Sequence, residues 1–204
     1  MATIVEESVQ VAQPRYRWTT AEFDRLVAEG FIREGSRVFL WDGEIIQPMP
    51  EDAIHSDACE NLVDLLKARL AVDAWAVNSG RPIALSDGFL PQPDVTVLRG
   101  PRSDRRGRRV VAADVNLVVE VANSSYATDA GPYLRLYALE GIPIYWIVNT
   151  KARRVEVYSR PDRRAGRYDL QSSFGLGQAV PLTLEDIAFE PVPVESLLRD
   201  SIEG

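Results

Sequence analysis

The sequence predicts an α/β domain built around a mixed β-sheet. The order of the patterns is the first observation: a helix, a β-hairpin and a second helix precede several strands that one further helix interrupts. Composition is the second, because 204 residues with 46% hydrophobic and 26% charged side chains are typical of a globular domain with its own core. We expect one domain over residues 17–200, preceded by a flexible arm over residues 1–16.

The N-terminal elements carry clear local signals. Residues 18–30 form a predicted helix, in which Thr19 or Thr20 is the N-cap and Gly30 ends the last turn. Residues 37–50 form a predicted β-hairpin, because an Asp-Gly pair between two apolar runs is typical of a two-residue turn.

A second helix and a series of strands follow. Residues 54–71 are predicted to be helical because apolar side chains recur on one face. That stripe consists of Cys59, Leu62, Leu66 and Leu70. After it we expect strands near 74–79, 81–86, 94–98 and 116–122, a helix over 128–141 closing at Gly141, strands over 143–150 and 153–160, and then short strands and a terminal turn around 194–200.

Several classes of protein are disfavoured by simple counts. The single cysteine, Cys59, cannot form an internal disulfide, which favours a reducing compartment. No stretch approaches the roughly 20 apolar residues of a membrane span, and the N-terminus lacks the regions of a signal peptide. We therefore expect a cytoplasmic protein with no membrane partner.

Charge is distributed unevenly along the chain. The net charge of −7 argues against indiscriminate binding of nucleic acid. Residues 101–167, however, hold 13 Lys and Arg against 7 Asp and Glu, whereas the rest of the chain holds 10 against 23. The stretch "PRSDRRGRRV" (101–110) is the densest part. It either faces a phosphate backbone or is a solvated loop whose arginines pair with the acidic half of the chain.

Two carboxylates occupy unexpected places in predicted strands. Asp94 stands behind Pro93 at the start of the strand in "PQPDVTVL" (91–98), and Glu120 lies within the apolar run "VNLVVEVA" (115–122). Burying an unpaired charge costs several kcal/mol. Alternation along the strand places Glu120 on the face opposite its two valine neighbours. That face is exposed to solvent, supplies an arginine partner, or lines a water-filled cleft.

Carboxylates at the ends of neighbouring strands favour a site for a hard divalent ion, Mg²⁺ or Mn²⁺. Such an ion polarises a phosphodiester and activates water. Glu44, just after the hairpin turn, could supply a third oxygen. His55, the only histidine, lies on the inward stripe of its helix, so it is either a rim residue of the same cleft and a candidate metal ligand, or a hydrogen-bonded core residue. The His/Cys spacing of zinc sites is not recognised, so zinc is not expected.

Five motifs in order resemble a known family. They are "LWDGEIIQPMP", "HSDACENLVDLL", "PQPDVTVL", "LVVEVANSS" and "LRLYALEGIPIYWIVN", within residues 17–160. The chain resembles the Uma-type restriction endonucleases of bacteria, which belong to the PD-(D/E)XK nuclease superfamily. The resemblance implies a restriction-endonuclease-like mixed β-sheet flanked by helices, with an N-terminal helix and hairpin, and a Mg²⁺-dependent site that acts on DNA. By position, Asp94 resembles the motif aspartate, Glu120 the second acid, and Glu44 an acid frequent near the family's site.

The sequence departs from the family pattern at one position. The family's lysine usually stands in a stretch resembling D-x-G-x-K-x-x-x-Y-A, and here "DAGPYLRLYA" (129–138) has Tyr133 in its place. A tyrosine can donate a hydrogen bond but carries no charge at neutral pH. An arginine from 102–109, or Arg135, is an alternative source of the missing positive charge.

Two functions follow from this pattern. The first is a metal-dependent endonuclease that hydrolyses phosphodiester bonds in DNA with a site lacking the usual lysine. The second is a catalytically inactive nuclease-fold protein that acts as a DNA-binding or protein-interaction module. A homodimer is a further possibility, because the apolar run "IPIYWIV" (142–148) could form an interface as readily as a core.

Overall fold

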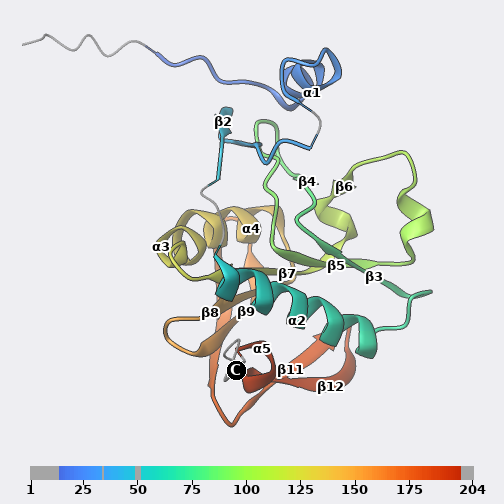
Figure 1. Cartoon of the computed structure of the whole chain (residues 1–204), viewed down its shortest axis with the longest axis vertical. Coiled ribbons are helices and arrows are strands. Elements are labelled where there is room, and N and C mark those ends of the chain that lie inside the picture. The colour runs from blue at the N-terminus through green and yellow to red at the C-terminus, as the bar shows by residue number, and fades with distance from the viewer. Residues whose placement is uncertain (1–13, 34, 49–51, 199–204) are drawn as a thin grey trace, which may run out of the picture.

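A computed structural model describes residues 14–33, 35–48 and 52–198. A central six-stranded sheet in the order β10-β9-β8-β7-β5-β3 forms the body of the protein (Figure 1). Its strands are β3 (Trp75–Ser79), β5 (Val95–Arg99), β7 (Val115–Ala122), β8 (Ile144–Asn149), β9 (Arg154–Asp162) and β10 (Arg167–Gly175). Strands β7 and β8 are parallel, whereas the other neighbouring pairs are antiparallel. The predicted mixed α/β fold is confirmed.

The N-terminal elements form where local signals predict them. They are α1 (Thr20–Ala28), β1 (Phe39–Trp41), β2 (Glu44–Ile46) and α2 (Ala53–Arg69). Thr19 is the N-cap of α1 and forms a capping box with Glu22. The turn between β1 and β2 has φ of +47° at Asp42 and +69° at Gly43, as a two-residue hairpin turn requires. Of the expected N-terminal arm, residues 1–13 lie outside the described part of the chain.

Helices cover both faces of the central sheet (Figure 1). Leu62 of α2 belongs to the same core cluster as Val97 and Val119 on one face. On the other face, Tyr137 shares a core cluster with Val118. Because side chains alternate along β7, Glu120 points to the same side as Val118, which confirms the predicted orientation of this carboxylate.

The helix expected over 128–141 is divided into three parts. They are α3 (Tyr126–Thr128), a π-helical turn (Asp129–Tyr133) and α4 (Leu134–Glu140). Pro132 lies inside the π-helical turn. Because proline has no N–H and its ring crowds the preceding turn, the regular hydrogen-bond ladder is interrupted here. Gly141, with φ of +75°, ends α4 as expected.

The peripheral strands differ from the expected ones. The strand expected over 81–86 is only β4 (Ile83–Ala84), which pairs in parallel with β6 (Val110–Val111) outside the central sheet. The C-terminal strands are longer than expected, and include the nine-residue β10. Most β10 side chains are exposed, so no apolar alternation marks the strand, and its length follows from pairing with β9. The remaining elements are β11 (Ala179–Leu184), β12 (Ile187–Pro193), α5 (Val194–Leu197) and two 3₁₀ turns (Arg102–Arg105 and Ala112–Asp114).

The apolar run 142–148 is mostly core. Ile142 and residues 145–148 are buried in the protein, since β8 is flanked by β7 and β9. This run therefore packs inside the protein instead of forming an exposed surface. Among the helices of the described residues, none combines the length and the apolar character needed to cross a bilayer.

Candidate active site

A cavity of about 670 Å³ opens where β5 begins, and its wall brings together segments that are distant in the sequence. Asp94 and Glu120 line it from neighbouring strands, His55 lines it from α2, and Tyr133 lines it from the end of the π-helical turn. Four of the five residues singled out in the sequence therefore share one cavity. Asp129, from the start of the π-helical turn, lines it as well.

Asp94 and Glu120 are held beside each other by the pairing of β5 with β7. The register pairs Val95 with Val119, so Asp94, just before β5, lies opposite Glu120 of β7. The backbone N–H of Asp94 donates to Glu120 Oε2 at 3.2 Å, and that of Val121 donates to Asp94 Oδ2 at 2.7 Å. The sheet thus positions both carboxylates through backbone hydrogen bonds.

Glu120 is almost fully buried, with 4% of its surface exposed. Its Oε1 accepts a hydrogen bond from the hydroxyl of Tyr137 at 2.8 Å, and no arginine pairs with it among the described residues. Burial, and then the charges of Asp94 and Asp129, raise the pKa of Glu120 well above its ordinary range. Of the alternatives left open by the sequence, solvent exposure and an arginine partner are both excluded within the described chain.

Asp129 is a site residue that the sequence analysis did not single out. Its side chain is 3% exposed and accepts a hydrogen bond from Ser125 Oγ at 2.6 Å. Burial and the nearby charge of Asp94 raise the pKa of Asp129 to about 6, against opposing effects of Ser125 and His55. The signal for Asp129 in the sequence is its position at the head of "DAGPYLRLYA", the stretch that also contains Tyr133.

His55 contacts Asp94 directly. Its Nε2 lies 3.0 Å from Asp94 Oδ2, and Asp52 caps the helix by accepting a hydrogen bond from the backbone N–H of His55 at 2.9 Å. Cys59, one turn later on α2, has its Sγ 3.7 Å from His55 Nδ1. The ligand atoms of His55, Cys59 and Asp94 lie within 4.8 Å of one another, so together they could hold a metal ion. The i, i+4 spacing of His55 and Cys59 on one helix face is therefore a usable His/Cys pair, contrary to the sequence analysis.

Tyr133 is packed rigidly into the cavity wall. Its ring stacks on Trp41 with a centroid distance of 4.4 Å, and its edge meets Tyr137 at 6.0 Å. Burial and the charges of Glu120, Asp129 and Asp94 raise the pKa of Tyr133, so its hydroxyl stays protonated. Tyr133 can therefore offer a neutral hydrogen-bond donor to the cavity but no positive charge.

Arg37 is the one Lys or Arg among the described residues that line the cavity. The alternatives named from the sequence lie elsewhere: the arginines of 102–109 line a different cavity, and Arg135 donates to the carbonyl of Ala165 at 3.4 Å. Arg37 precedes β1, in a segment with no apparent chemical motif. Only the packing of the segment before β1 brings it to the same cavity as the carboxylates.

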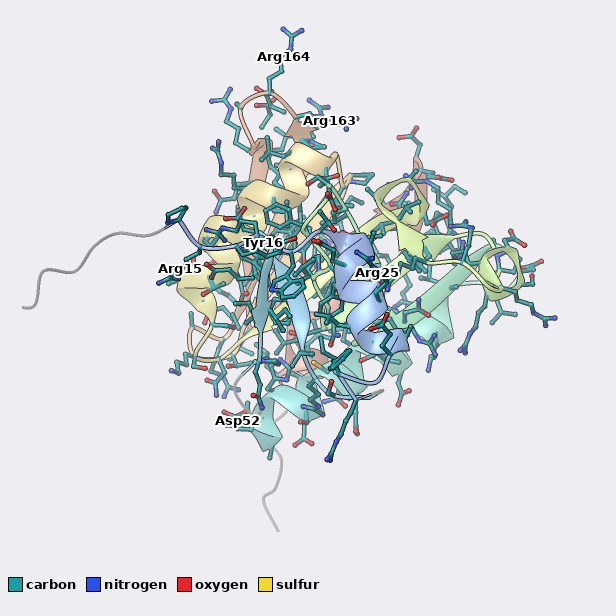
Figure 2. All side chains as sticks on the ribbon, turned by 90° about the horizontal axis from the view of Figure 1, so that it is seen from above. Arg15, Tyr16, Arg25, Asp52, Arg163 and Arg164 are labelled. Carbon is teal, nitrogen blue, oxygen red and sulfur yellow. The ribbon has the colours of Figure 1, made fainter. Side chains whose placement is uncertain are left out.

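Glu44 is not brought to this cavity. It lies in β2 and forms ion pairs with Arg15 at 3.3 Å and Arg17 at 3.2 Å. Figure 2 shows Arg15 and Tyr16 on the segment that runs beside the hairpin. Strands β1 and β2 form a separate two-stranded sheet, and Glu44 faces the N-terminal arginines from it. Its assignment to the site from the sequence is therefore not supported by its position.

The carboxylates that line the cavity are donors of the kind that a hard divalent ion takes. Asp94, Glu120 and Asp129 provide carboxylate oxygens, the donors that Mg²⁺ and Mn²⁺ prefer. The raised pKa values of Glu120 and Asp129 follow first from burial and then from the charges of the neighbouring acids. His55 and Cys59 add one nitrogen and one sulfur donor, which a softer ion such as zinc also accepts.

Replacing Asp129 with asparagine tests this electrostatic arrangement through protein stability. The pKa of Asp129 is about 6 when folded, above the ordinary 3.8, so its contribution to stability is present below about pH 4 and is lost as the pH rises through 6. At about pH 8 the Asp129→Asn variant should be more stable than the native protein, by up to about 3 kcal/mol. At about pH 4 this advantage should vanish.

Urea unfolding in EDTA at both pH values measures the two free energies. Asparagine keeps an oxygen that can accept the Ser125 hydrogen bond, so the comparison isolates the charge. An equal difference between native and variant at the two pH values would contradict the raised pKa of Asp129.

Comparisons with known proteins identify the fold and the family of the chain. The chain shares its fold with a solved structure described as "a putative nuclease belonging to DUF820" from Anabaena variabilis ATCC 29413, on which it superposes with a TM-score of 0.64. That match has 18% identity and covers 88% of this chain and 97% of the other. Residues 20–192 match the Uma2 family, described as "Putative restriction endonuclease", and the chain belongs to this family. No curated protein matches the chain.

Proposed function

We propose that the protein is a divalent-metal-dependent endonuclease that hydrolyses phosphodiester bonds in DNA. The observation that carries the proposal is the convergence of Asp94, Glu120 and Asp129 on one cavity, with Asp94 and Glu120 positioned by adjacent strands of the sheet. Membership of a restriction endonuclease family supports the class of reaction. A cluster of acids repels a phosphate group. This repulsion is relieved when a cation binds between the acids and the phosphate.

Asp94 and Glu120 would hold the ion, with Asp129 as a third oxygen donor. When bound, Mg²⁺ or Mn²⁺ polarises the phosphodiester and lowers the pKa of water. The hydroxyl of Tyr137 and the backbone N–H groups of Asp94 and Val121 fix the directions of the two carboxylates. This preorganisation keeps the ligands in place in the absence of substrate.

His55 positions Asp94. Its ring nitrogen lies 3.0 Å from the carboxylate, and the capped first turn of α2 holds the imidazole there. The contact orients one oxygen of Asp94 and leaves the other for a ligand.

The missing lysine is compensated by two residues in this proposal. Arg37 brings a guanidinium to the cavity and stabilises the charge that develops on the phosphoryl oxygens. Tyr133 donates a hydrogen bond to the same region from a side chain fixed by stacking on Trp41. This division replaces the single charged donor of the family pattern with one charged and one neutral donor.

The direct test uses the full chain and supercoiled plasmid DNA. With Mg²⁺ or Mn²⁺ we expect nicked and linear products, and with EDTA we expect none. Each ion alone should raise the Tm, because a ligand that binds only the folded state at about 100 times its Kd adds roughly 2.7 kcal/mol to stability. A raised Tm without cleavage would favour the inactive DNA-binding or interaction module. No cleavage and no change in Tm would contradict the metal site itself.

A further inference from the structure

A second cavity, of about 660 Å³, is lined by arginines from two separate segments. Asn78 and Arg81 come from the end of β3 and the turn to β4, and the other arginines come from the loop between β5 and β6. The arginines that line it are Arg81, Arg102, Arg105, Arg106, Arg108 and Arg109. No Asp or Glu lines this cavity among the described residues. The cavity is therefore a concentrated positive site in a chain whose net charge is −7.

Three of these arginines have structural partners. Arg105 is buried and donates to the backbone carbonyls of Gly100 at 2.8 Å and Pro101 at 3.1 Å, which closes the loop on itself. Arg108 forms a bidentate pair with Asp114, with both distances 2.7 Å. Arg109 pairs with an aspartate of α1. The interpretation that the loop arginines pair with acids holds for Arg108 and Arg109.

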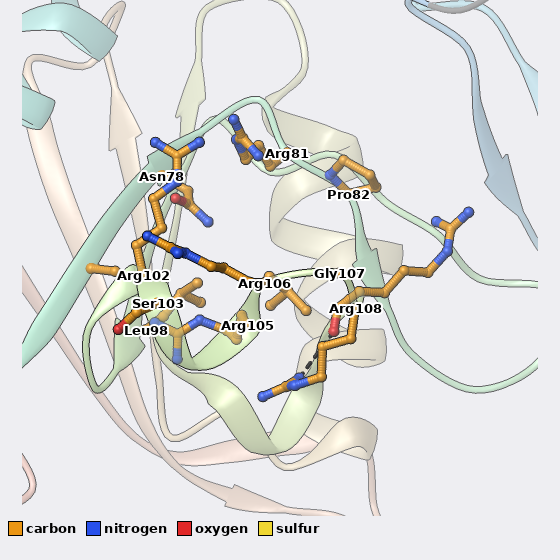
Figure 3. A pocket seen from close by; sticks show the side chains of 13 residues that line it. Asn78, Arg81, Pro82, Leu98, Arg102, Ser103, Arg105, Arg106, Gly107 and Arg108 are labelled. Atoms are coloured by element: carbon orange, nitrogen blue, oxygen red, sulfur yellow. Dashed lines mark hydrogen bonds between the residues drawn. The ribbon is translucent and has the colours of Figure 1, made fainter.

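The other three arginines have no such role. Arg81, Arg102 and Arg106 are exposed, and their side chains make no hydrogen bond or ion pair with the described residues. Figure 3 shows their side chains on the side of the cavity where Asn78 lies. Gathering three guanidinium groups without an acid costs electrostatic energy, which an anion in the cavity would offset. Guanidinium groups also match the geometry of phosphate oxygens.

The arginine cavity adjoins the acidic cavity, which is the one lined by Asp94, Glu120 and Asp129. The turn after β3 contributes to both: Ser79 and Gly80 line the acidic cavity, whereas Asn78 and Arg81 line the arginine cavity. The backbone N–H of Gly80 lies 3.1 Å from the carbonyl oxygen of Asp94, to which it donates, so this turn is tied to the start of β5. An anion held by the arginines would therefore lie on the same side of the molecule as the proposed catalytic residues.

We propose that Arg81, Arg102 and Arg106 bind a backbone phosphate of the DNA that flanks the bond to be cleaved. This inference rests on the proposed function. The acidic cavity and the net charge repel a polyanion, so attraction must come from a local cluster. Contact with a phosphate carries no sequence information, and the arginines therefore set affinity and register without selecting bases.

The test compares the full-length native protein with two double variants by DNA binding. Arg102→Gln/Arg106→Gln removes two of the three arginines that have no side-chain partner within the described part of the chain. Arg160→Gln/Arg164→Gln removes two exposed arginines at the β9–β10 hairpin and serves as the matched control. In Figure 2, Arg164 lies at the opposite end of the molecule from Asp52, which lines the acidic cavity. The binding measurements use Ca²⁺ in place of Mg²⁺, so that the acidic cavity is occupied by an ion whose coordination differs from that of Mg²⁺.

The Arg102/Arg106 variant should bind short duplex DNA about tenfold more weakly, and its slope of log K against log salt should fall by about 1 per lost contact. The control should lose much less. Equal losses in the two variants would overturn the local site. Inorganic phosphate is the second probe: if it protects the native protein from heat but the variant binds DNA normally, the cavity binds a free anion and the proposal is wrong. If the native protein does not bind DNA at all, the proposed function fails as well.

Discussion

Replacing Asp94 with asparagine should reduce metal-dependent cleavage of DNA by about 10³-fold or more. The substitution keeps the size of the side chain and an oxygen that can accept the backbone hydrogen bond of Val121, but removes the negative charge. A correctly held ion contributes several kcal/mol to transition-state stabilisation, and each 1.36 kcal/mol is about tenfold in rate. Initial rates of plasmid nicking at saturating Mn²⁺ measure the loss.

Asp64→Asn is the matched control, because Asp64 is an exposed acid on α2 that does not line the acidic cavity. It should cleave at the native rate. Without metal, Asp94→Asn should be at least as stable as the native protein, since the repulsion between Asp94 and Glu120 is relieved. The rise in Tm on adding Mn²⁺ should disappear in Asp94→Asn and persist in Asp64→Asn. Cleavage by Asp94→Asn near the native rate would remove Asp94 from the site.

Replacing Arg37 with glutamine should lower cleavage by about 10²–10³-fold, the usual effect of losing one preorganised charge-stabilising donor. Adding Tyr133→Lys to the Arg37→Gln variant should restore much of this rate. The lysine would place an ammonium group near Asp94, Glu120 and Asp129, whose charges already act on Tyr133. Loss of the stacking contact with Trp41 should cost about 0.5–1.5 kcal/mol of stability.

The matched control for this pair is Arg33→Gln, an exposed arginine shortly before Arg37 that does not line the cavity. Kinetics at varied DNA concentration distinguish a lower kcat from weaker binding. A native rate in Arg37→Gln would show that this guanidinium plays no part in the reaction. In that case, faster DNA cleavage by the Tyr133→Lys single variant than by the native protein would indicate that the native site works without a nearby cation. No activity in the native protein or in either variant would favour the inactive module.

Local signals in the sequence predict much of the fold. The Asp-Gly pair of the hairpin adopts the positive φ angles that its turn type needs, and Thr19 caps α1 through its own side chain. Alternation along β7 predicts the face of Glu120 correctly. Each of these features depends on residues close together in the chain, so short-range geometry is sufficient to predict it.

Other features depend on contacts between distant segments. Asp129 and Arg37 reach the acidic cavity because a π-helical turn and a loop before β1 fold against the start of β5. Glu44 matches the family pattern by position, yet its hairpin forms a separate sheet and turns it toward Arg15 and Arg17. The placement of Arg37 and of Glu44 has no signal in the neighbouring residues, whereas Asp129 is marked only by its position at the head of "DAGPYLRLYA".

By itself, the sequence determined the class of fold and the positions of most helices and strands. It also determined the positions of Asp94 at the start of one strand and of Glu120 within another. Only the tertiary structure decided which charged residues accompany them. It separated the arginines of 102–109 into those with structural partners and those that line the second cavity without a partner among the described residues. The physical reason is that backbone periodicity sets the direction of a side chain within its own element, whereas its partners depend on how elements pack.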